Sequence, residues 1–340
     1  MRNNILSIAV IGSGSWGTAL AVLLSKNSHK VKLWGHKSNH VDNLLKDREN
    51  KKYLPGINFP TSLVPVTEVD YAVEGADIVV MAVPSHALRD IFKRVCPFLK
   101  DYCRLISAVK GVENGTLLTM TQLMGEVLRK SDKVSKGIEI GVLSGPSFAK
   151  EVAICSPTAV TLGFENIETA IEIQKVFVNE YFRVYASRDV LGIETCAALK
   201  NVIAIAAGVC EGLGYGLNTR AALITRGLAE MRRLGKSIQT DDATFLGLSG
   251  IGDLILTCTG NLSRNRMVGI QLGKGKCLSE IVAEMSMVAE GIKNTKSVYY
   301  LAKKHNIEMP IVEQVYQIVY NNKECSLAVS DLLKRDLKVE

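Results

Sequence analysis

The sequence lacks the features that mark a membrane or secreted protein. No apolar run reaches the ~18 residues expected of a membrane span. The first residues lead directly into an apolar segment, without the small-residue cleavage site of a secretory signal. We therefore expect a cytoplasmic protein that makes no integral membrane contact.

Paired cysteines and histidine clusters are also missing. The 8 cysteines form no C-x-x-C pair, which argues against a zinc site and against a disulfide framework. We expect the thiols to serve mainly as small apolar side chains in a reducing compartment, and we expect no bound metal.

Positive charge is in excess but is not concentrated. The formal net charge is +7, yet Lys and Arg are scattered among Asp and Glu, and the longest basic runs are pairs. Nucleic-acid-binding surfaces gather such charge in blocks or stripes. The pattern argues against a nucleic-acid partner and indicates only a mild preference for anionic ligands.

Short apolar runs and helical patterns alternate through the first half of the chain. The runs are mostly continuous, as in buried parallel strands. They cover residues 6–11, 31–34, 78–83, 104–109 and 140–143, with two more at 158–162 and 182–185. Helical patterns such as 17–26 and 87–98 lie between them, so the rhythm is β-α-β. The prediction is a doubly wound, mostly parallel α/β domain of the Rossmann type over residues 1–188.

Strand patterns stop after about residue 188. Long helical patterns follow at residues 193–209, 219–234, 278–285, 294–304 and 311–320. We therefore expect a second, all-α domain over residues 189–340.

A glycine motif follows the first predicted strand and begins a helical pattern. Gly12, Gly14 and Gly17 have the spacing G-x-G-x-x-G, and this β-α-β context is the one that a dinucleotide-binding fingerprint requires. Gly12 would make the tight turn, Gly14 would admit the pyrophosphate, and Gly17 would let the helix pack on the strand. A plain tight turn is the structural alternative, and the context favours the nucleotide.

The acidic residue that usually follows such a motif is absent. An NAD-selective site has Asp or Glu about 20 residues further on, whereas here the second strand pattern leads into Gly35, His36 and Lys37. Two groups that can carry positive charge suit a 2′-phosphate, so NADP(H) is favoured, with NAD(H) also accepted. The alternative is that both side chains are merely exposed.

A lysine interrupts an apolar helical pattern in the second half. In GIETCAALKNVIAIAAG, residues 192–208, Lys200 shares its helical face with small and aliphatic residues. A lysine is costly to bury there unless it is paired. Either its stem crosses apolar surface while its head reaches water, or it is a catalytic ammonium group with a shifted pKa. The scarcity of polar residues on that face favours catalysis.

Two later segments supply candidate partners. Asp253 lies among glycines and apolar residues, where it either makes a turn or cap or pairs with Lys200 and orients it. Ser263, Arg264 and Asn265 precede another helical pattern. Hydroxyl, guanidinium and amide groups at a helix start suit a phosphate or carboxylate, although Ser263 alone equally suits an ordinary N-cap.

Together these segments resemble the bacterial-type NAD(P)-dependent glycerol-3-phosphate dehydrogenases over about residues 7–325. The matching segments are GSGSWGTALA, WGHK, AVKGVE, SGPSFAKE, LKNVIAIAAGVCEGLGYGLNTRAALITRGLAEM, LSGIGDLILTCTGNLSRNR and VAEGIKNTK. One departure is Ala197, where the family commonly has glycine, and it leaves Lys200 in place.

The resemblance implies a reaction, an architecture and an assembly. The reaction would be the reversible reduction of dihydroxyacetone phosphate to sn-glycerol 3-phosphate for phospholipid synthesis. The helical domain would be of the 6-phosphogluconate dehydrogenase type, and the protein would be a homodimer. Eukaryotic relatives typically use NAD, and bacterial ones often use NADPH.

The resemblance also implies residue roles. Lys200 would donate and accept the proton. As our own mechanistic hypothesis, we add that Asp253 holds Lys200 in place and that Lys110 gives electrostatic stabilisation. The substrate-lining residues would be Lys110, Gly145, Ser147, Lys200, Asp253, Ser263, Arg264 and Asn265. Beside the glycines and Lys37, the nucleotide contacts would be Ser15, Trp16, His36, Lys110, Ala149, Arg264, Val288 and Glu290.

Two other functions stay open at this point. A related β-hydroxyacid dehydrogenase would use Arg264 to bind a carboxylate, but the resemblance across the Lys200 segment argues against it. A nucleotide-sensing module without chemistry would need neither a lysine on an apolar helix face nor an anion clamp.

Overall fold

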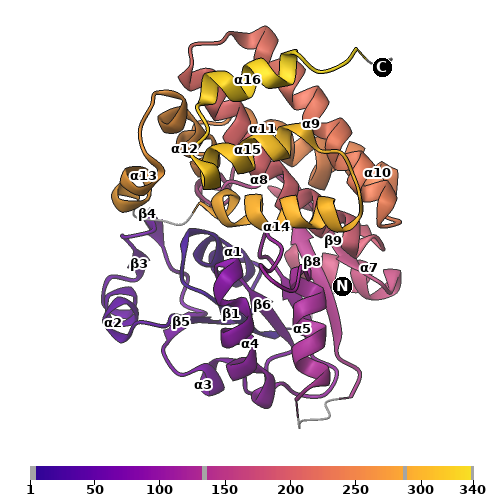
Figure 1. Ribbon diagram of the computed structural model, residues 1–340. Helices are drawn as coiled ribbons and strands as arrows, with labels where there is room; N and C mark the ends of the chain where they lie inside the picture. Colours follow the sequence, from indigo (N-terminus) through magenta and orange to yellow (C-terminus); the bar gives the residue numbers. More distant parts are fainter. Residues whose placement is uncertain (1–4, 132–135, 286–288, 338–340) are drawn as a thin grey trace. The chain divides into compact units, whose positions relative to one another are not determined.

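The computed structural model describes residues 5–131, 136–285 and 289–337, and these residues form two compact units (Figure 1). The first unit comprises the described residues up to Val109 together with Met120–Val190. The second comprises Lys110–Thr119 and the described residues from Leu191 onward. The segment Lys110–Thr119, which the sequence pattern places within the first domain, therefore clusters with the helical part of the chain.

An 8-stranded sheet forms the centre of the first unit, in the order β10-β9-β8-β7-β6-β1-β2-β5. All neighbouring strands are parallel except the antiparallel pair β8 and β9, so the predicted mostly parallel sheet is confirmed. The strands are β1 (Ser7–Ile11), β2 (Lys30–Trp34), β5 (Leu63–Val66), β6 (Ile78–Met81), β7 (Arg104–Ser107), β8 (Glu139–Ser144), β9 (Thr158–Phe164) and β10 (Phe182–Ser187).

Helices cover the sheet and account for the continuous apolar strands. Val10, Leu33, Val80 and Ile106 are fully buried, as expected when helices hide a parallel sheet. The helices of this unit are α1 (Ser15–Lys26), α2 (Ser38–Asp47), α3 (Val69–Val73), α4 (Leu88–Val95), α5 (Met120–Arg129), α6 (Ala149–Ala153) and α7 (Ile167–Phe177). Short 3₁₀ turns at Ser85–Ala87 and Cys96–Phe98 flank α4.

Three strands escaped sequence-based prediction. Strand β5 contains Pro65, which cannot donate a ladder hydrogen bond, and the strand lies at the sheet edge, where that loss is tolerated. Strands β3 (Glu49–Asn50) and β4 (Leu54–Asn58) form a separate antiparallel hairpin. The proline and glycine in the segment LPGIN are typical of a turn. For this reason the sequence pattern did not predict the strands of this hairpin.

The second unit is helical, as predicted. Its helices are α8 (Val190–Gly212), α9 (Leu217–Ser237), α10 (Asp242–Leu246), α11 (Asp253–Thr259), α12 (Arg264–Gly273), α13 (Leu278–Glu284), α14 (Glu290–Lys304), α15 (Pro310–Asn321) and α16 (Cys325–Leu333). A π-helical turn, Leu248–Gly252, leads into α11. Besides the helices, the described part of this unit has one isolated bridge, between Val112 and Thr119.

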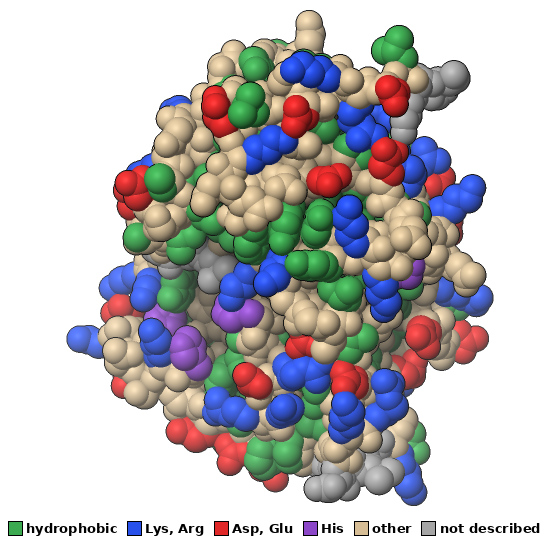
Figure 2. Space-filling model, in the orientation of Figure 1, with side chains coloured by type: hydrophobic (Ala, Val, Ile, Leu, Met, Phe, Trp, Pro, Cys, Tyr) green, Lys and Arg blue, Asp and Glu red, His purple; other side chains and the backbone are tan. Residues whose placement is uncertain are grey.

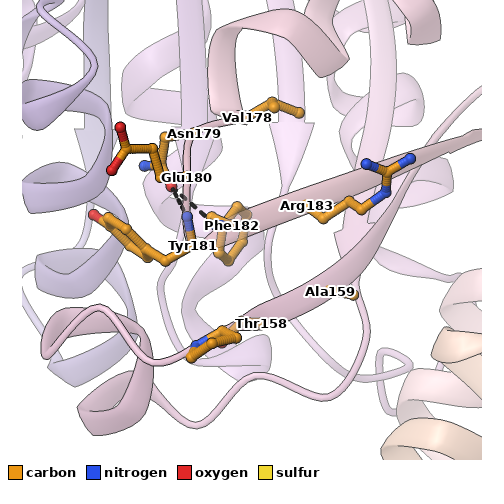
Figure 3. A pocket seen from close by; sticks show the side chains of 9 residues that line it. Thr158, Ala159, Val178, Asn179, Glu180, Tyr181, Phe182 and Arg183 are labelled. Atoms are coloured by element: carbon orange, nitrogen blue, oxygen red, sulfur yellow. Dashed lines mark hydrogen bonds between the residues drawn. The ribbon is translucent and has the colours of Figure 1, made fainter.

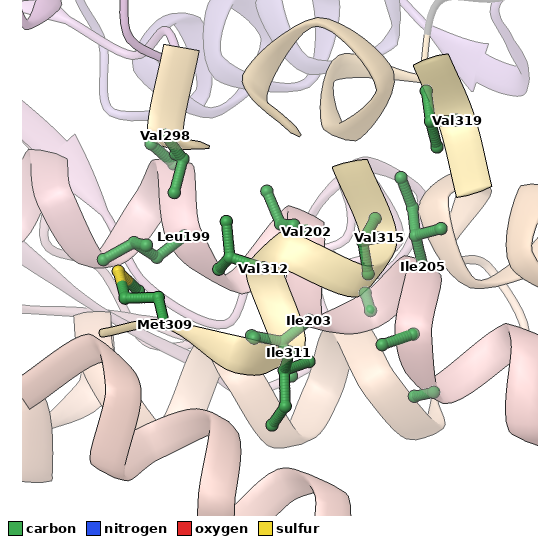
Figure 4. Close-up of a cluster of buried hydrophobic side chains, with 14 of the residues drawn as sticks. Leu199, Val202, Ile203, Ile205, Val298, Met309, Ile311, Val312, Val315 and Val319 are labelled. Atoms are coloured by element: carbon green, nitrogen blue, oxygen red, sulfur yellow. The ribbon is translucent and has the colours of Figure 1, made fainter. Parts of the chain in front are cut away.

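Helix α8 is the core helix of the second unit. Its aliphatic side chains, among them Val202 and Ile203, meet Val298 of α14 and Val312 and Val315 of α15 in one buried cluster (Figure 4). Among the described helices, α8 alone has the length and hydropathy of a membrane span, but 89% of that window is buried inside the protein. Its apolar character is therefore used in the protein core.

Glycines allow α8 to lie against α12. A Cβ on Gly208 would lie 2.0 Å from the carbonyl oxygen of Arg266, and a Cβ on Gly269 would lie 2.0 Å from that of Ile205. Real Cβ atoms do not come so close to a carbonyl oxygen, so both positions require glycine. The backbones of α8 and α12 are thus in direct contact.

A buried carboxylate joins α9 to α15. Glu230 is 2% exposed and accepts hydrogen bonds from the backbone N–H groups of Ile311 at 2.7 Å and Val312 at 3.3 Å. These donors belong to the first turn of α15, which otherwise lacks a side-chain cap. Burial raises the pKa of Glu230 to about 7, although the two N–H groups lower it in part.

We expect Glu230→Gln to change how stability depends on pH. The folded protein keeps the Glu230 proton up to about pH 7, whereas the unfolded chain loses it near pH 4.5. The parent's free energy of unfolding therefore falls as the pH rises through this window. The variant cannot ionise, so urea unfolding at pH 5 and pH 8.5 should show its stability rising relative to the parent's by about 1–3 kcal/mol.

The matched control is Glu313→Gln, on the first turn of α15, whose N–H groups donate to Glu230, with a side chain that is 43% exposed. It should show no such trend. A stability difference between Glu230→Gln and the parent that is equal at both pH values would contradict the buried, proton-holding state of Glu230.

Candidate functional site

The glycine-rich loop between β1 and α1 has two glycines that packing requires and one that it does not. Gly12 has a φ of 122°, and a Cβ there would lie 2.5 Å from the carbonyl oxygen of Ala82. A Cβ on Gly17 would lie 1.9 Å from the carbonyl oxygen of Gly12. A Cβ on Gly14 would meet nothing within 4 Å. The protein's own packing therefore gives no reason for glycine at position 14.

The start of α1 supplies that reason. Gly14 is its N-cap, no side chain caps the helix, and its first turn has no acidic residue. Unpaired N–H groups and the helix dipole make such a terminus suitable for a phosphate, and a missing side chain at Gly14 lets the ligand approach the backbone. The residues present therefore fit the pyrophosphate of a dinucleotide.

The indole of Trp16 points into an apolar cluster. It packs against a buried cluster of Ala19 from α1, Leu54 from β4 and Ala153 from α6, against which Ile57 and Ala149 also pack. Its Nε1 is buried and has no hydrogen-bond partner among the described residues. The large side chain thus leaves the loop backbone accessible, and the same cluster brings Ala149 beside the glycine-rich loop.

Basic side chains lie where β2 ends. His36 and Lys37 are exposed. Desolvation lowers the pKa of His36, and the positive charges of Lys37 and Arg94 lower it further. The guanidinium of Arg94, from α4, lies 5.4 Å from the ring centre of Trp34. Arg94 is a cation of this region that sequence analysis missed, because it lies 58 positions after His36.

On the face that Figure 2 shows, Lys and Arg side chains lie interspersed with Asp and Glu. This distribution agrees with the scattered charges of the sequence.

The loop after β8 also belongs to the first unit. Gly145 has a φ of 138°, and a Cβ there would lie 2.9 Å from the Cα of Val160. The Ser147 hydroxyl donates to the carbonyl oxygen of Gly145 at 2.9 Å. This loop leads through Ser147 to α6, which begins at Ala149.

A buried lysine–aspartate network lies in the second unit. Lys200 is 4% exposed, and its Nζ donates to Asp253 Oδ1 at 2.6 Å and to Thr257 Oγ1 at 3.0 Å. The other carboxylate oxygen, Oδ2, accepts from Lys110 Nζ at 2.8 Å. One buried carboxylate therefore holds two ammonium groups, and the predicted pairing of Asp253 with Lys200 is present in the structure.

The local fold explains this convergence. The π-helical turn Leu248–Gly252 directs the chain into α11, so that Asp253 begins the helix and Thr257 lies one turn later on the same face. The Thr257 hydroxyl also donates to the backbone oxygen of Asp253 at 2.6 Å. Lys110 comes from the segment Lys110–Thr119, which clusters with these helices.

The charges of the network shift one another's pKa values. Burial lowers the pKa of Lys200 to about 7; Asp253 opposes this shift and Lys110 adds to it. Burial alone would raise the pKa of Asp253, but the two ammonium groups hold it below its usual value. At neutral pH the site thus combines an ionised aspartate with a lysine that can release and regain a proton.

Amide side chains form further buried hydrogen bonds in the second unit. Asn265 Nδ2 donates to Asn201 Oδ1 at 2.8 Å, and Asn265 Oδ1 accepts from the backbone N–H of Gly291. Asn294 Nδ2 donates to the carbonyl oxygen of Lys110 at 3.3 Å. Asn294 is fully buried, and its Oδ1 has no hydrogen-bond partner among the described residues. A buried amide with an unused acceptor is typical of a site that binds a polar ligand.

Sequence analysis missed Thr257, Asn201 and Asn294. Two of them carried a signal, because Asn201 follows Lys200 directly and Thr257 lies one helical turn after Asp253. Asn294 carried none, since its contact with Lys110 joins positions 184 residues apart.

At the start of α12, some side chains make hydrogen bonds within the protein and one is exposed to solvent. Ser263 is the N-cap, and its hydroxyl oxygen accepts from the backbone N–H of Arg266 at 3.3 Å. Arg264 is exposed; desolvation lowers its pKa, and the nearby Glu290 carboxylate raises it. Arg266 is buried and holds Glu211 with two hydrogen bonds, so it has a structural role. Val288 lies outside the described residues.

A pocket of about 350 Å³ lies in the first unit. It is lined by residues 157–159 and 178–183 around strands β9 and β10 (Figure 3). The Asn179 side chain turns inward to accept from the N–H groups of Tyr181 and Phe182. None of the residues predicted to bind substrate or coenzyme lines this pocket.

Comparisons with known proteins identify a family and close relatives for this chain. Residues 7–170 match the family model "NAD-dependent glycerol-3-phosphate dehydrogenase N-terminus", and residues 189–330 match the corresponding C-terminus model. A protein of Desulfotalea psychrophila named glycerol-3-phosphate dehydrogenase [NAD(P)+] is 56% identical over 100% of both chains. One of Citrifermentans bemidjiense with the same name is 50% identical over 98% of each. The crystal structure of glycerol-3-phosphate dehydrogenase from Coxiella burnetii has a TM-score of 0.90 at 39% identity, covering 97% of this chain and 99% of that one.

Proposed function

The chain belongs to the NAD-dependent glycerol-3-phosphate dehydrogenase family, and on this premise we propose that it catalyses the reversible reduction of dihydroxyacetone phosphate to sn-glycerol 3-phosphate. The observation that carries the proposal is the buried network in which Asp253 holds the ammonium groups of Lys200 and Lys110. The reaction would supply the glycerol phosphate backbone of phospholipids.

The first unit, in this proposal, binds the coenzyme. The backbone at Gly12, Gly14, Ser15, Trp16 and Gly17 would hold the pyrophosphate at the start of α1. Ala149 packs against the same apolar cluster as Trp16 and would border the nucleotide. When bound, the nicotinamide coenzyme supplies the hydride. The other coenzyme contacts in this proposal, which the resemblance implies, are Lys110, Arg264, Glu290 and Val288.

Lys200 is the proposed acid and base. During reduction, the substrate C2 oxygen gains negative charge, and the Lys200 ammonium would donate a proton to it. The lysine becomes neutral and regains a proton from solvent; in the reverse direction the neutral amine would accept the hydroxyl proton. A pKa near neutrality suits both directions. Lys110 would stabilise the developing negative charge, and Asp253 would orient both amines.

The substrate phosphate requires an anchor remote from the reacting carbon. Arg264 is exposed at the start of α12, and Asn265 is held by Asn201 and Gly291. We assign the phosphate to Arg264 and Asn265, since a guanidinium and a helix N-terminus both favour phosphate. Ser263, Gly145 and Ser147 complete the proposed substrate contacts. This anchor would fix the orientation of the carbonyl group.

Coenzyme turnover tests the proposal. With dihydroxyacetone phosphate, we expect oxidation of both NADPH and NADH, with the lower KM for NADPH because His36 and Lys37 favour a 2′-phosphate. The measurement is the loss of reduced-nicotinamide absorbance, with 3-hydroxyacids and oxidised coenzyme as the control reaction. Absence of turnover with dihydroxyacetone phosphate would refute the function, and a strong NADH preference would refute the role of His36 and Lys37.

Location and assembly stay predictions. A cytoplasmic enzyme and a homodimer are what the family resemblance implies. Sedimentation of the purified protein over a range of concentrations would give the assembly directly.

A further inference from the structure

The peptide group between Ser13 and Gly14 is held from outside the glycine-rich loop. Asn50, the last residue of β3, donates from its side-chain Nδ2 to the carbonyl oxygen of Ser13 at 2.9 Å. The imidazole of His40, on α2, lies close enough to the Ser13 backbone for that backbone to raise its pKa, although desolvation lowers the pKa more strongly. Asn50 is 0% exposed, so its contacts within the protein are not shared with solvent.

The remaining contacts of Asn50 attach the hairpin to the loop and to α1. Its Nδ2 also donates to Thr18 Oγ1 at 2.8 Å, and its Oδ1 accepts from the backbone N–H of Tyr53 at 3.2 Å. In return, the Ser15 hydroxyl donates to the carbonyl oxygen of Tyr53 at 2.7 Å. The amide thus uses both of its donor hydrogens and its acceptor, which asparagine alone provides at this size.

This anchoring fixes the direction of one N–H group. A peptide bond is planar and trans, so the N–H of Gly14 points opposite to the carbonyl of Ser13. Because that carbonyl is turned toward Asn50, the Gly14 N–H is turned away from the hairpin. A Cβ on Gly14 would meet nothing within 4 Å, and no side chain caps α1. The hairpin therefore holds the loop on one side, and the Gly14 N–H points to the other.

We propose that Asn50 is a positioning residue for the coenzyme pyrophosphate. It acts through the Ser13 carbonyl and Thr18, and orients the Gly14 N–H before the coenzyme arrives. The inference rests on the proposed function only in that the ligand is NAD(P)(H). This proposal also gives a role to the hairpin of β3 and β4, which is inserted between α2 and β5.

The test is Asn50→Asp, which keeps the shape and removes both donors. The dissociation constants of NADPH and NADH, measured by coenzyme fluorescence without turnover, should each rise about tenfold or more, since two buried hydrogen bonds are lost. Their ratio should stay constant because the pyrophosphate is common to both. The KM for dihydroxyacetone phosphate, measured at saturating coenzyme, should stay within about twofold because the substrate contacts are untouched.

The matched control is Asn27→Asp at the other end of α1, where Nδ2 donates to the carbonyl oxygen of Val176 at 2.9 Å. It should leave both dissociation constants within about twofold, since these contacts do not reach the glycine-rich loop. Should Asn50→Asp fail to fold, Thr18→Val removes one anchor without adding charge, and both dissociation constants should rise about threefold.

The possible results distinguish the positioning role of Asn50 from the proposed dehydrogenase function. Unchanged coenzyme affinity in a folded Asn50→Asp or Thr18→Val variant would overturn the positioning role, while the parent's turnover stands. An equal loss in Asn27→Asp would also overturn it, because any damage to α1 would then suffice. A parent protein that binds neither coenzyme would refute the proposed function itself.

Discussion

Lys200→Ala should lower the rate of dihydroxyacetone phosphate reduction by about 10²–10⁴-fold, the range that general acid catalysis provides, while coenzyme affinity stays within about twofold. The proposed proton donor is lost, and the coenzyme loop belongs to the other unit. Stopped-flow or steady-state rates at saturating substrate, together with coenzyme titration, measure the two quantities separately.

Lys200→Arg separates charge from proton transfer. Arginine keeps a cation beside Asp253, but it does not release a proton at any pH at which the enzyme is assayed. The rate should therefore stay low in this variant as well. Near-parental turnover in either variant would exclude Lys200 as the acid. Recovery in Lys200→Arg alone would show that its charge is sufficient.

Asp253→Asn should lower the rate by about 10²-fold or more, because it removes the orienting partner of the proposed acid, and should shift the pH profile. The carboxylate raises the pKa of Lys200 against burial, so its loss makes the ammonium more acidic. Reduction requires the protonated lysine, and the rate therefore falls as the pH rises through its pKa. We expect the midpoint of that fall in kcat/KM to move to lower pH in the variant.

Stability provides a second readout for the same change. Two ammonium groups that shared one carboxylate would be left without it, and an uncompensated buried charge costs about 3–5 kcal/mol. The control is Asp242→Asn, whose exposed ion pair with Arg232 should contribute little to stability because solvent screens it. An unchanged pH midpoint together with normal stability would show that Asp253 does not control Lys200.

The sequence predicts buried elements better than it predicts edges. Strands such as Ile78–Met81 are apolar throughout because helices cover them, and continuous apolar runs predict them well. Strand β5 and the hairpin of β3 and β4 contain Pro65, Pro55 and Gly56, whose local preferences favour turns. Their pairing with other segments overrides those preferences, and a single sequence does not display pairing.

The residues of the candidate site were likewise predictable from local sequence only where no long-range contact was needed to identify them. Lys200 was identifiable because a lysine on an apolar helix face needs a partner, and Asp253 was a plausible one. The second ammonium group of the network depends on Lys110 and Asp253, which are 143 positions apart. Asn50 gave no signal at all, because a buried asparagine between charged residues has the sequence appearance of a loop.

The backbone contact between α8 and α12 has a consequence for how the substrate range can change. Helix α8 carries the proposed acid, Lys200, and α12 carries the proposed phosphate anchor, Arg264. With no side chains between the helices at Gly208 and Gly269, there is no intervening layer whose trimming or enlargement would alter their separation. The backbone contact thus fixes the distance between Lys200 and the start of α12. Accepting a longer or shorter phosphorylated ketone would therefore require replacing the phosphate anchor instead of repacking the core.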